Sequence, residues 1–393
     1  MSLPRPVTLA VYKDFMKSGR GADRATAALC NALSARGFTV HLLTQQDAAT
    51  PLSAPLSPAV RLHRLPARRM PFLNKLLLTS ALGARLLRRR LPRFDALRRF
   101  SETLQAAVRN LRPDLILSTG PNECVELTYA GALPAPILQI FHIYPPVCFA
   151  KNKYRRATLL REALRSVAAC QVLQPSYRAA LRPYADAPAF VIGNGVAWDP
   201  DEPPPEPGAR QKTIVYIAYF SKDKNQAALI EAFARLRADG WQLHLYGSGT
   251  PAQEAQLRRL AETLGVAKRV RFAGLTQTPQ AILRQASVCA FPSRTEGFSL
   301  ALAEAMWEGL PCVGFRDAPG VCEQIEDGVT GLLAAPDVAS FAAALQRLVD
   351  DAALRQELGA QAAKQVRERH AAERVWEQWE ALLLRLLPRP DAP

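Results

Sequence analysis

The sequence predicts an α/β protein with two doubly wound, mainly parallel sheets. A chain of 393 residues is too long for one ordinary core and suggests two domains of similar size. Short apolar runs with the character of strands alternate with longer runs that have helical periodicity. This alternation stops near the middle of the chain and then starts again, which places a domain boundary there.

The first half of the chain opens as a βαβ unit. Its predicted elements are, in order, a strand at 7–12, a helix at 22–36 that Gly37 ends, and strands at 39–43, 115–117, 137–141 and 190–192. Helical stretches separate the later strands, as in a doubly wound sheet. We therefore expect residues 1–195 to form the N-terminal domain.

Composition marks the boundary between the domains. Residues 196–212 include the run Asp-Pro-Asp-Glu-Pro-Pro-Pro-Glu-Pro-Gly, whose prolines lack amide donors and fix φ, so this stretch is predicted to be a linker. The second domain is then predicted at 213–370, beginning with a strand at 213–218, a helix at 226–238 and a strand at 242–246. Both halves are thus expected to be Rossmann-like, followed by an amphipathic helix at 372–387 within a terminal segment 371–393.

Positive charge is concentrated in the first half of the chain. Residues 1–195 hold 28 Lys and Arg against 10 Asp and Glu, a net charge of +18, whereas the remainder has a net charge of −3. No acidic residue occurs from Ala48 to Phe94, and residues 72–91 have the pattern of a basic amphipathic helix. This helix either docks on its own sheet with a solvated basic face or also lies on an anionic membrane surface. Nucleic acid is not expected as a partner, because the arginines lack interleaved aromatic residues.

The cysteines and the hydrophobic runs bear on the compartment. Seven scattered cysteines form no Cys-x-x-Cys pair, which argues for a reducing compartment and against a zinc site. The N-terminal apolar run is too short for a signal peptide, and no window reaches the roughly 18 apolar residues of a spanning helix. A cytoplasmic protein is expected, with peripheral association at the inner face of the cytoplasmic membrane as the open alternative.

The stretch Ser293-Arg-Thr-Glu-Gly-Phe-Ser-Leu-Ala-Leu-Ala-Glu-Ala-Met carries the most specific pattern in the chain. Glu296 is expected on a loop after a buried strand, and Glu304 more than one turn into the helix that comes next. The free amides of Gly297, Phe298 and Ser299 lie between them at a helix N-terminus, which favours anions. Two carboxylates beside such a terminus suit a ligand that has a polyol at one end and a phosphate at the other.

The residues after this stretch make the pattern more specific. They form, in order, a Gly-Leu-Pro strand, a Pro-Gly loop with Glu323 and an Asp-Gly-x-x-Gly turn. Together they resemble the donor-binding half of retaining family 4 glycosyltransferases of GT-B architecture, specifically over residues 213–335 and more loosely before residue 190. The resemblance implies two Rossmann-like domains that face a central cleft, with the C-terminal helix crossing back to the first domain.

The resemblance also assigns roles to residues. Glu296 and the amides after it would hold sugar hydroxyls and diphosphate, Glu304 the ribose hydroxyls, and Lys224 the charge of the leaving group. His142, at the end of a predicted strand, corresponds to a histidine that faces the donor sugar and acceptor, and we group it with Glu296 as catalytic. Further donor-side residues are Gly19 and Gly21 in the loop after the first strand, Gly247 in a turn beside the pocket, Leu275 near the base, and Arg294.

One position departs from the family pattern. Many relatives have Gly-Arg with the arginine five residues before the lysine that corresponds to Lys224, whereas this chain has Ala218-Tyr219. A guanidinium that binds phosphate is therefore missing from its usual place. Lys222 or Arg294 would restore the charge, although a lysine does not reproduce a planar bidentate clamp.

The expected activity is transfer of a hexose-type sugar from a nucleoside diphosphate, UDP by family frequency, to a saccharide or lipid-linked acceptor with retention. Such a reaction belongs to cell-surface polysaccharide, lipopolysaccharide or glycolipid synthesis. No metal or other cofactor is expected, because Asp199-Pro-Asp201, although it has Asp-x-Asp spacing, lies in the linker. Two alternatives stay open: a GT-B binding or scaffolding subunit without catalysis, and a nucleotide-sugar epimerase of the same architecture.

Overall fold

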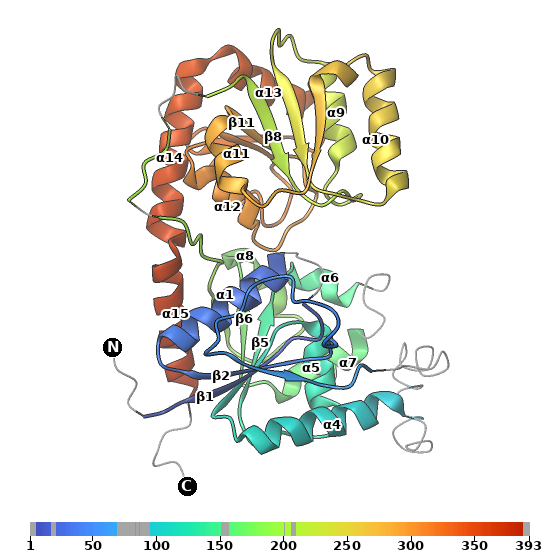
Figure 1. The fold of residues 1–393 in the computed structure, drawn as a ribbon, viewed down its shortest axis with the longest axis vertical. Helices are drawn as coiled ribbons and strands as arrows, with labels where there is room; N and C mark the ends of the chain where they lie inside the picture. Colours follow the sequence, from blue (N-terminus) through green and yellow to red (C-terminus); the bar gives the residue numbers. More distant parts are fainter. Residues whose placement is uncertain are drawn as a thin grey trace. The chain divides into compact units, whose positions relative to one another are not determined.

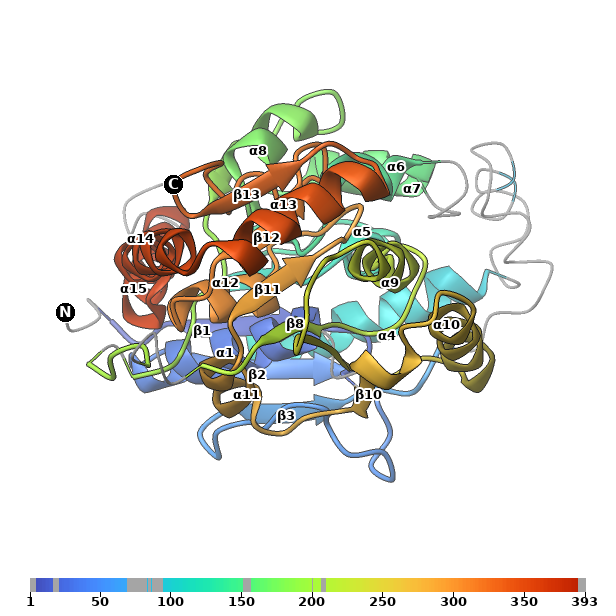
Figure 2. The same ribbon diagram turned by 90° about the horizontal axis from the view of Figure 1, so that it is seen from above.

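The computed structural model describes residues 5–16, 21–68, 83, 86, 95–150, 157–199, 201–205 and 210–387. The chain divides into two compact units, Met1–Gly193 with Trp376–Pro393, and Asn194–Val375. Each unit has its own parallel sheet with helices packed on it (Figure 1, Figure 2). The predicted α/β architecture of two Rossmann-like domains is therefore confirmed.

The N-terminal unit contains a seven-stranded sheet in the order β3-β2-β1-β4-β5-β6-β7, with all pairs parallel. Its strands are β1 (Thr8–Tyr12), β2 (Thr39–Thr44), β3 (Arg61–Arg64), β4 (Leu115–Ser118), β5 (Ile137–Phe141), β6 (Ala169–Val172) and β7 (Ala189–Val191). The direction of winding reverses between β1 and β4. Ligands of open α/β sheets bind outside the carboxyl ends of the strands at such a switch point.

Helices connect these strands. They are α1 (Gly21–Ala35), α4 (Ala96–Leu111), α5 (Pro121–Thr128), α6 (Pro145–Phe149), α7 (Ala157–Ala163) and α8 (Pro175–Leu181), with a short 3₁₀ turn at Leu164–Ser166. Asp95 begins α4 by accepting the amides of Leu97 and Arg98, as a carboxylate at an N-cap does. The hydroxyl of Tyr129 donates to the same carboxylate at 2.8 Å, so this cap also ties α4 to the end of α5.

The last helix, α15 (Ala372–Leu386), agrees with the predicted amphipathic run. From Trp376 onward it belongs to the N-terminal unit, as the predicted crossing helix should. Its apolar side is buried through Trp379, Leu382 and Leu383. The predicted basic helix at 72–91 lies outside the described residues, apart from Gly83 and Leu86.

The C-terminal unit contains a six-stranded parallel sheet in the order β10-β9-β8-β11-β12-β13, which reverses direction between β8 and β11. Its strands are β8 (Thr213–Ile217), β9 (Gln242–Tyr246), β10 (Val270–Gly274), β11 (Val288–Phe291), β12 (Cys312–Phe315) and β13 (Gly331–Ala334). Its helices are α9 (Gln226–Ala234), α10 (Pro251–Thr263), α11 (Pro279–Gln285), α12 (Leu300–Trp307), α13 (Val338–Asp350) and α14 (Ala352–His370), with a 3₁₀ turn at Ala267–Arg269.

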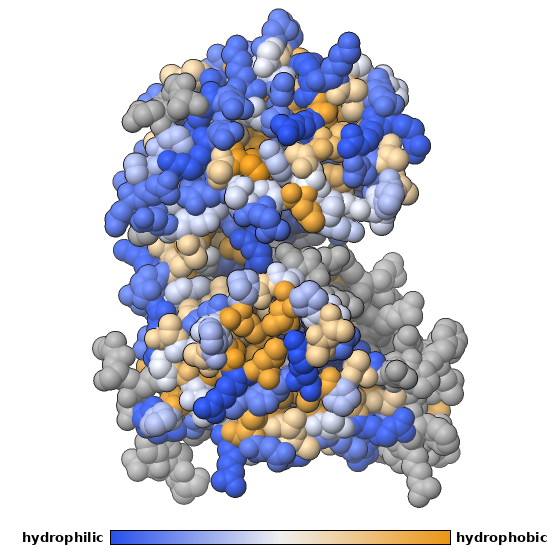
Figure 3. Space-filling view, viewed as in Figure 1, coloured by the Kyte–Doolittle hydropathy of each residue, from blue (hydrophilic) through white to orange (hydrophobic). Residues whose placement is uncertain are grey.

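The surface is mainly hydrophilic on the face that Figure 3 shows, with hydrophobic residues gathered in small groups on each unit. Leu275 is the most exposed large hydrophobic residue of the described chain, at 76%. Among the described helices, none combines the length and apolar character that crossing a membrane requires.

Candidate functional site

Two loops leave the carboxyl edge of the C-terminal sheet at its switch point. One runs from residue 218 to 225, between β8 and α9, and the other from 292 to 299, between β11 and α12. Because β8 and β11 are adjacent strands, the two loops lie beside each other. This is the edge at which an open α/β sheet binds ligands.

A buried tyrosine joins these loops. The hydroxyl of Tyr216, on β8, donates to the carbonyl of Lys224 at 3.1 Å and lies 2.7 Å from the hydroxyl of Ser293. Tyr216 and Ser293 are fully buried. Burial, and next the nearby carboxylate of Glu296, raise the pKa of Tyr216 well above its ordinary value, so the hydroxyl stays protonated and can donate.

Two further hydrogen bonds fix the same loops. The side-chain amide of Asn225 donates to the carbonyl of Pro292 at 3.3 Å, and the amide of Arg294 donates to the carbonyl of Asp223 at 2.9 Å. Asn225 adopts the left-handed region, with φ of 57°, which asparagine tolerates better than most residues. Its conformation lets the chain turn directly from Lys224 into α9.

The fixed loops bring two predicted site residues together. The ammonium group of Lys224 donates to Oε1 of Glu296, and the pair is an ion pair. The side chain of Lys224 is 27% exposed and that of Glu296 is 10% exposed, so the pair is partly accessible to solvent. A cation and a carboxylate held this way can bind an anion and hydroxyl groups side by side.

The start of α12 differs from the expectation of three free amides. Ser299 is the N-cap, and its hydroxyl accepts the amide of Leu302. Its own amide donates at 2.8 Å to the side chain of Gln324, whose amide nitrogen donates back to the Ser299 carbonyl. The prediction that the Ser299 amide is free is therefore wrong. The amides of Gly297 and Phe298 have no hydrogen-bond acceptor among the described residues, so the donors of these two are unsatisfied there.

The second glutamate lies where its spacing predicted. Glu304 is the fifth residue of α12 and is 4% exposed. The backbone amide of Glu296 donates to the carbonyl of Pro319 at 2.8 Å, and this bond holds the loop that carries Glu296. The Pro-Gly loop thus supports the glutamate loop through the backbone.

Gly247 has a structural reason to be glycine. Its amide donates to the carbonyl of Gly274 at 2.8 Å, and a Cβ at this position would overlap the carbonyl of Ala218. The close approach brings the ends of β8, β9 and β10 together. Tyr219 and Leu275 come after two of these strands and are 42% and 76% exposed at this edge.

The candidates for the missing guanidinium are both at the surface. Lys222 and Arg294 are exposed, and the backbone bond of Arg294 to Asp223 places it beside the loop of Lys224. Arg294 is thus adjacent to the ion pair through the backbone, and its role as a donor-side residue stays a prediction.

In the N-terminal unit, His142 directly succeeds β5 at the carboxyl edge of the sheet, as predicted. Both ring nitrogens are hidden from solvent and have no hydrogen-bond partner within the described part of the chain. Burial, and next the positive charge of Lys13, lower the pKa of His142 to about 3, so the ring is neutral at pH 7. Gly21 is the first residue of α1, and Gly19 lies outside the described residues.

Sequence reasoning missed a charged cluster at this edge. The ammonium group of Lys13, just after β1, lies 2.7 Å from Asp14 Oδ1 and 2.8 Å from Glu123 Oε1. Burial lowers the pKa of Lys13, but the carboxylates of Glu123 and Asp14 raise it by more, so the pKa lies above its ordinary value. For Glu123, burial is the main effect and raises the pKa. The available signal was that charged residues come soon after two predicted strands.

The Asp-x-Asp pair of the linker has a local role. Asp199 accepts the backbone amide of Asp201 at 2.9 Å, as in a turn stabilised by an aspartate. No group of three or more metal-ligating side chains occurs in the described ranges.

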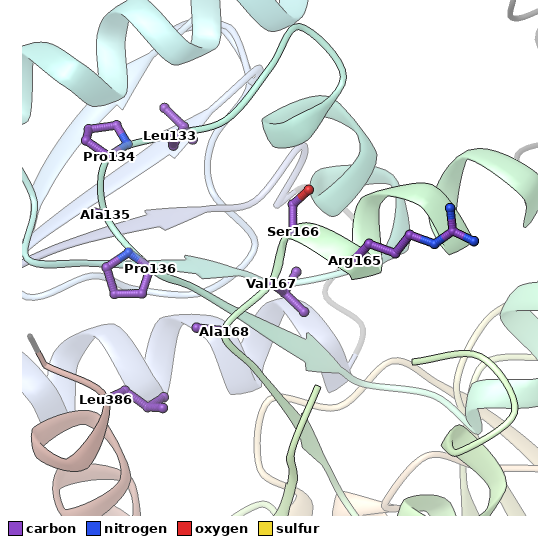
Figure 4. A pocket seen from close by; sticks show the side chains of 9 residues that line it. All are labelled: Leu133, Pro134, Ala135, Pro136, Arg165, Ser166, Val167, Ala168 and Leu386. Atoms are coloured by element: carbon purple, nitrogen blue, oxygen red, sulfur yellow. The ribbon is translucent and has the colours of Figure 1, made fainter. Parts of the chain in front are cut away.

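A surface hollow of about 530 Å³ lies elsewhere on the N-terminal unit. Figure 4 shows that it is lined by residues 133–136, residues 165–168 and Leu386. The two ranges precede β5 and β6, so the hollow is at the amino edge of the sheet. It is separate from the carboxyl edge where His142 lies.

Comparison with known proteins gives two family matches. Residues 19–199 match the model described as Glycosyltransferase Family 4, and residues 211–351 match the model described as Glycosyl transferases group 1. An exopolysaccharide phosphotransferase of Streptomyces coelicolor is 30% identical over 304 residues, which are 76% of this chain and 31% of that protein. The chain spans between about a third and a half of the length of the first curated relatives that it matches.

Solved structures share the fold over nearly the whole chain. Sucrose-phosphate synthase from Thermosynechococcus elongatus has a TM-score of 0.79 at 22% identity and covers 97% of this chain and 99% of its own. HepE of Anabaena, in complex with UDP and glucose, has a TM-score of 0.75 at 17% identity, and the match covers 96% of this chain and 100% of HepE. The two family matches succeed each other in the order of the two domains, and the chain therefore belongs to the GT-B glycosyltransferases of the family 4 type.

Proposed function

We propose that the chain is a retaining glycosyltransferase that moves a hexose-type sugar from a nucleoside diphosphate to a saccharide or lipid-linked acceptor. The observation that carries the proposal is the Lys224–Glu296 pair beside the amides of Gly297 and Phe298, which have no acceptor among the described residues. A cation and helix amides suit a diphosphate, and a carboxylate suits sugar hydroxyls. UDP is the proposed nucleotide, supported by the UDP and glucose of the HepE complex.

The ion pair suggests how the site changes when the donor binds. In the free protein, Lys224 and Glu296 neutralise each other. A diphosphate offers Lys224 a more highly charged partner, and the sugar hydroxyls offer Glu296 hydrogen-bond donors in exchange. Glu304, buried in α12, is the proposed partner of the ribose hydroxyls.

The proposed chemistry needs no covalent intermediate. The acceptor hydroxyl attacks the anomeric carbon on the face from which the diphosphate departs, the bond from that carbon to the phosphate oxygen breaks, and a phosphate oxygen takes the acceptor proton. Lys224 and the amides of Gly297 and Phe298 stabilise the charge that develops on the leaving group. His142 is proposed to contact the sugar as a neutral imidazole.

The proposed setting is cell-surface polysaccharide, lipopolysaccharide or glycolipid synthesis. It is supported by the curated relative that is named for an exopolysaccharide. That relative is named a phosphotransferase, and the chain spans only 31% of it, so its activity does not transfer to this chain.

The test is transfer and hydrolysis with a panel of nucleotide sugars by wild type, Glu296→Ala and Glu304→Ala. Both variants should lose most turnover, whereas Glu254→Ala, which removes only an exposed pair with Arg258, should not. Unchanged turnover in both site variants would overturn the site assignment. Nucleotide-sugar binding without any turnover would favour the scaffolding alternative. Inversion of the configuration at one carbon of the donor sugar, without transfer, would favour the epimerase.

The anionic membrane surface is a further part of the proposal, based on the net charge of +18 in residues 1–195. Binding to vesicles with anionic lipid should weaken with salt and when Arg88, Arg89 and Arg90 are replaced by Gln. These arginines lie outside the described residues. Binding that does not depend on salt would contradict a surface interaction.

A further inference from the structure

Gln174 has a side chain that does not fit its position. It is the N-cap of α8, where Ser, Thr, Asp and Asn are preferred because their short side chains accept a backbone amide. Gln174 makes no such cap, since no hydrogen bond joins its side chain to the helix. The residue is 6% exposed, and its amide nitrogen is buried with no hydrogen-bond partner among the described residues.

Gln174 belongs to the same edge of the sheet as His142. Strands β5 and β6 are adjacent and parallel, with Phe141 opposite Val172, so the chain leaves both strands side by side. The rings of Tyr144 and Tyr177, with centroids 5.0 Å apart, hold the two departing segments together. Two adjacent strand ends therefore carry three buried ring or amide nitrogens without hydrogen-bond partners in the described ranges.

Such unpartnered groups point to a ligand. Buried polar groups of native proteins are nearly always hydrogen-bonded, and exceptions that cluster need an explanation. A residue that departs from a local preference, here the preference for a short N-cap side chain, without a structural gain is typical of functional sites. Here a serine would cap the helix and remove the buried amide at once, whereas the glutamine side chain forms no hydrogen bond with the described residues and so lowers stability relative to serine.

The surrounding charges limit the chemistry of that ligand. Lys13 is already paired with Asp14 and Glu123 at the ends of β1 and β4, so its charge is balanced by two carboxylates. An anionic group placed next to Lys13 would be repelled by these carboxylates. A hydroxyl group both donates and accepts, which matches a neutral imidazole with one donor and one acceptor and an amide nitrogen with two donors.

We infer that Gln174 is a specificity-determining residue whose side-chain amide donates a hydrogen bond to a sugar-ring hydroxyl beside His142. The inference rests on the proposed function and adds a residue to its saccharide-binding side. The hydroxyl belongs either to the donor sugar or to the acceptor saccharide. Both sources share the same chemistry, and the assay separates them.

The test is Gln174→Ser, because a binding role and a structural role predict opposite results. Serine restores a preferred N-cap and removes the buried amide, so the Tm of the free protein should rise by roughly 2–4 °C. The kcat/KM for transfer should fall roughly tenfold with the loss of one hydrogen bond to substrate. An equal fall in donor hydrolysis without acceptor identifies the donor sugar, whereas unchanged hydrolysis identifies the acceptor.

Gln105→Ser is the matched control. Gln105 is also buried, but its side-chain amide donates to the carbonyls of Leu127 and Gly131, both at 2.8 Å. Its replacement should lower the Tm and leave kcat/KM unchanged. If Gln174→Ser behaves in this way, or if its kcat/KM stays within twofold of wild type, the inference is overturned. If wild type shows no turnover with any nucleotide sugar, that result overturns the proposed function instead, and with it the saccharide ligand.

Discussion

Replacement of His142 by Gln should make the protein more resistant to acid. The pKa of His142 is lowered to about 3 by burial and then by Lys13, from an ordinary value of 6.5. Between these two values the unfolded chain binds a proton that the folded protein does not bind. Stability contributed by the neutral ring is therefore complete above pH 6.5 and is lost as the pH falls toward 3.

The size of the effect can be worked from the two pKa values. One pKa unit corresponds to about 1.4 kcal/mol, so wild type loses about 2 kcal/mol of stability between pH 8 and pH 5 through His142. Glutamine occupies a similar space and does not titrate, so the variant avoids this loss. His370 also has a lowered pKa, about 4, because of its burial and then the charge of Arg369. It lies in the other unit, so its contribution is the same in wild type and variant and cancels in the comparison.

The assay is urea unfolding of wild type and His142→Gln at pH 8, 6.5 and 5, monitored by circular dichroism. At pH 8 the difference in free energy of unfolding measures packing alone and serves as the internal control. That difference should shift in favour of the variant by about 2 kcal/mol at pH 5. A difference that is the same at all three pH values would show that His142 is not held neutral by its surroundings, and would refute the reasoning.

Three further predictions concern Tyr216, Gly247 and Gly21. Tyr216→Phe, which removes the hydroxyl that joins the two loops, should lower the free energy of unfolding by about 1–3 kcal/mol, whereas Tyr246→Phe should change it little; equal effects in urea unfolding would contradict the bridge. Gly247→Ala should cost about 1–3 kcal/mol because its Cβ overlaps the Ala218 carbonyl. Gly21→Ala, with no atom within 4 Å of its Cβ, should leave stability within about 1 kcal/mol but weaken UDP binding in calorimetry; unchanged affinity would exclude a phosphate contact at Gly21.

The elements that sequence reasoning found are those with clear apolar runs. The strands at 137–141 and 242–246 were predicted with their observed bounds. Strands β3 and β6 were missed because polar residues interrupt their apolar runs: β3 is Arg-Leu-His-Arg at the edge of the sheet, and β6 is Ala-Cys-Gln-Val. Helix α9 ends at Ala234, before the predicted 238, because the next two amides bond three residues back and tighten the chain into a turn.

The residues of the candidate site could be named from the sequence, but their contacts could not. Lys224 and Glu296 each lie after a strand in a recognisable motif, yet they are 72 residues apart, and only the adjacency of β8 and β11 pairs them. Tyr216 has the pattern of a core residue in a strand, and its bridging hydroxyl is visible only in the structure. The bond from the Ser299 amide to Gln324 likewise depends on how a distant loop packs.

Calorimetric titration with UDP tests the central claim most directly, because it requires no knowledge of the sugar or acceptor. Wild type, Lys224→Met and Lys212→Met would be compared, the last as a control on the residue before β8 at the opposite edge of the sheet. Loss of a charge-assisted bond predicts that Lys224→Met binds UDP roughly tenfold to a hundredfold more weakly, with Lys212→Met like wild type. Equal affinity of wild type and Lys224→Met would contradict a nucleotide site at the Lys224–Glu296 pair.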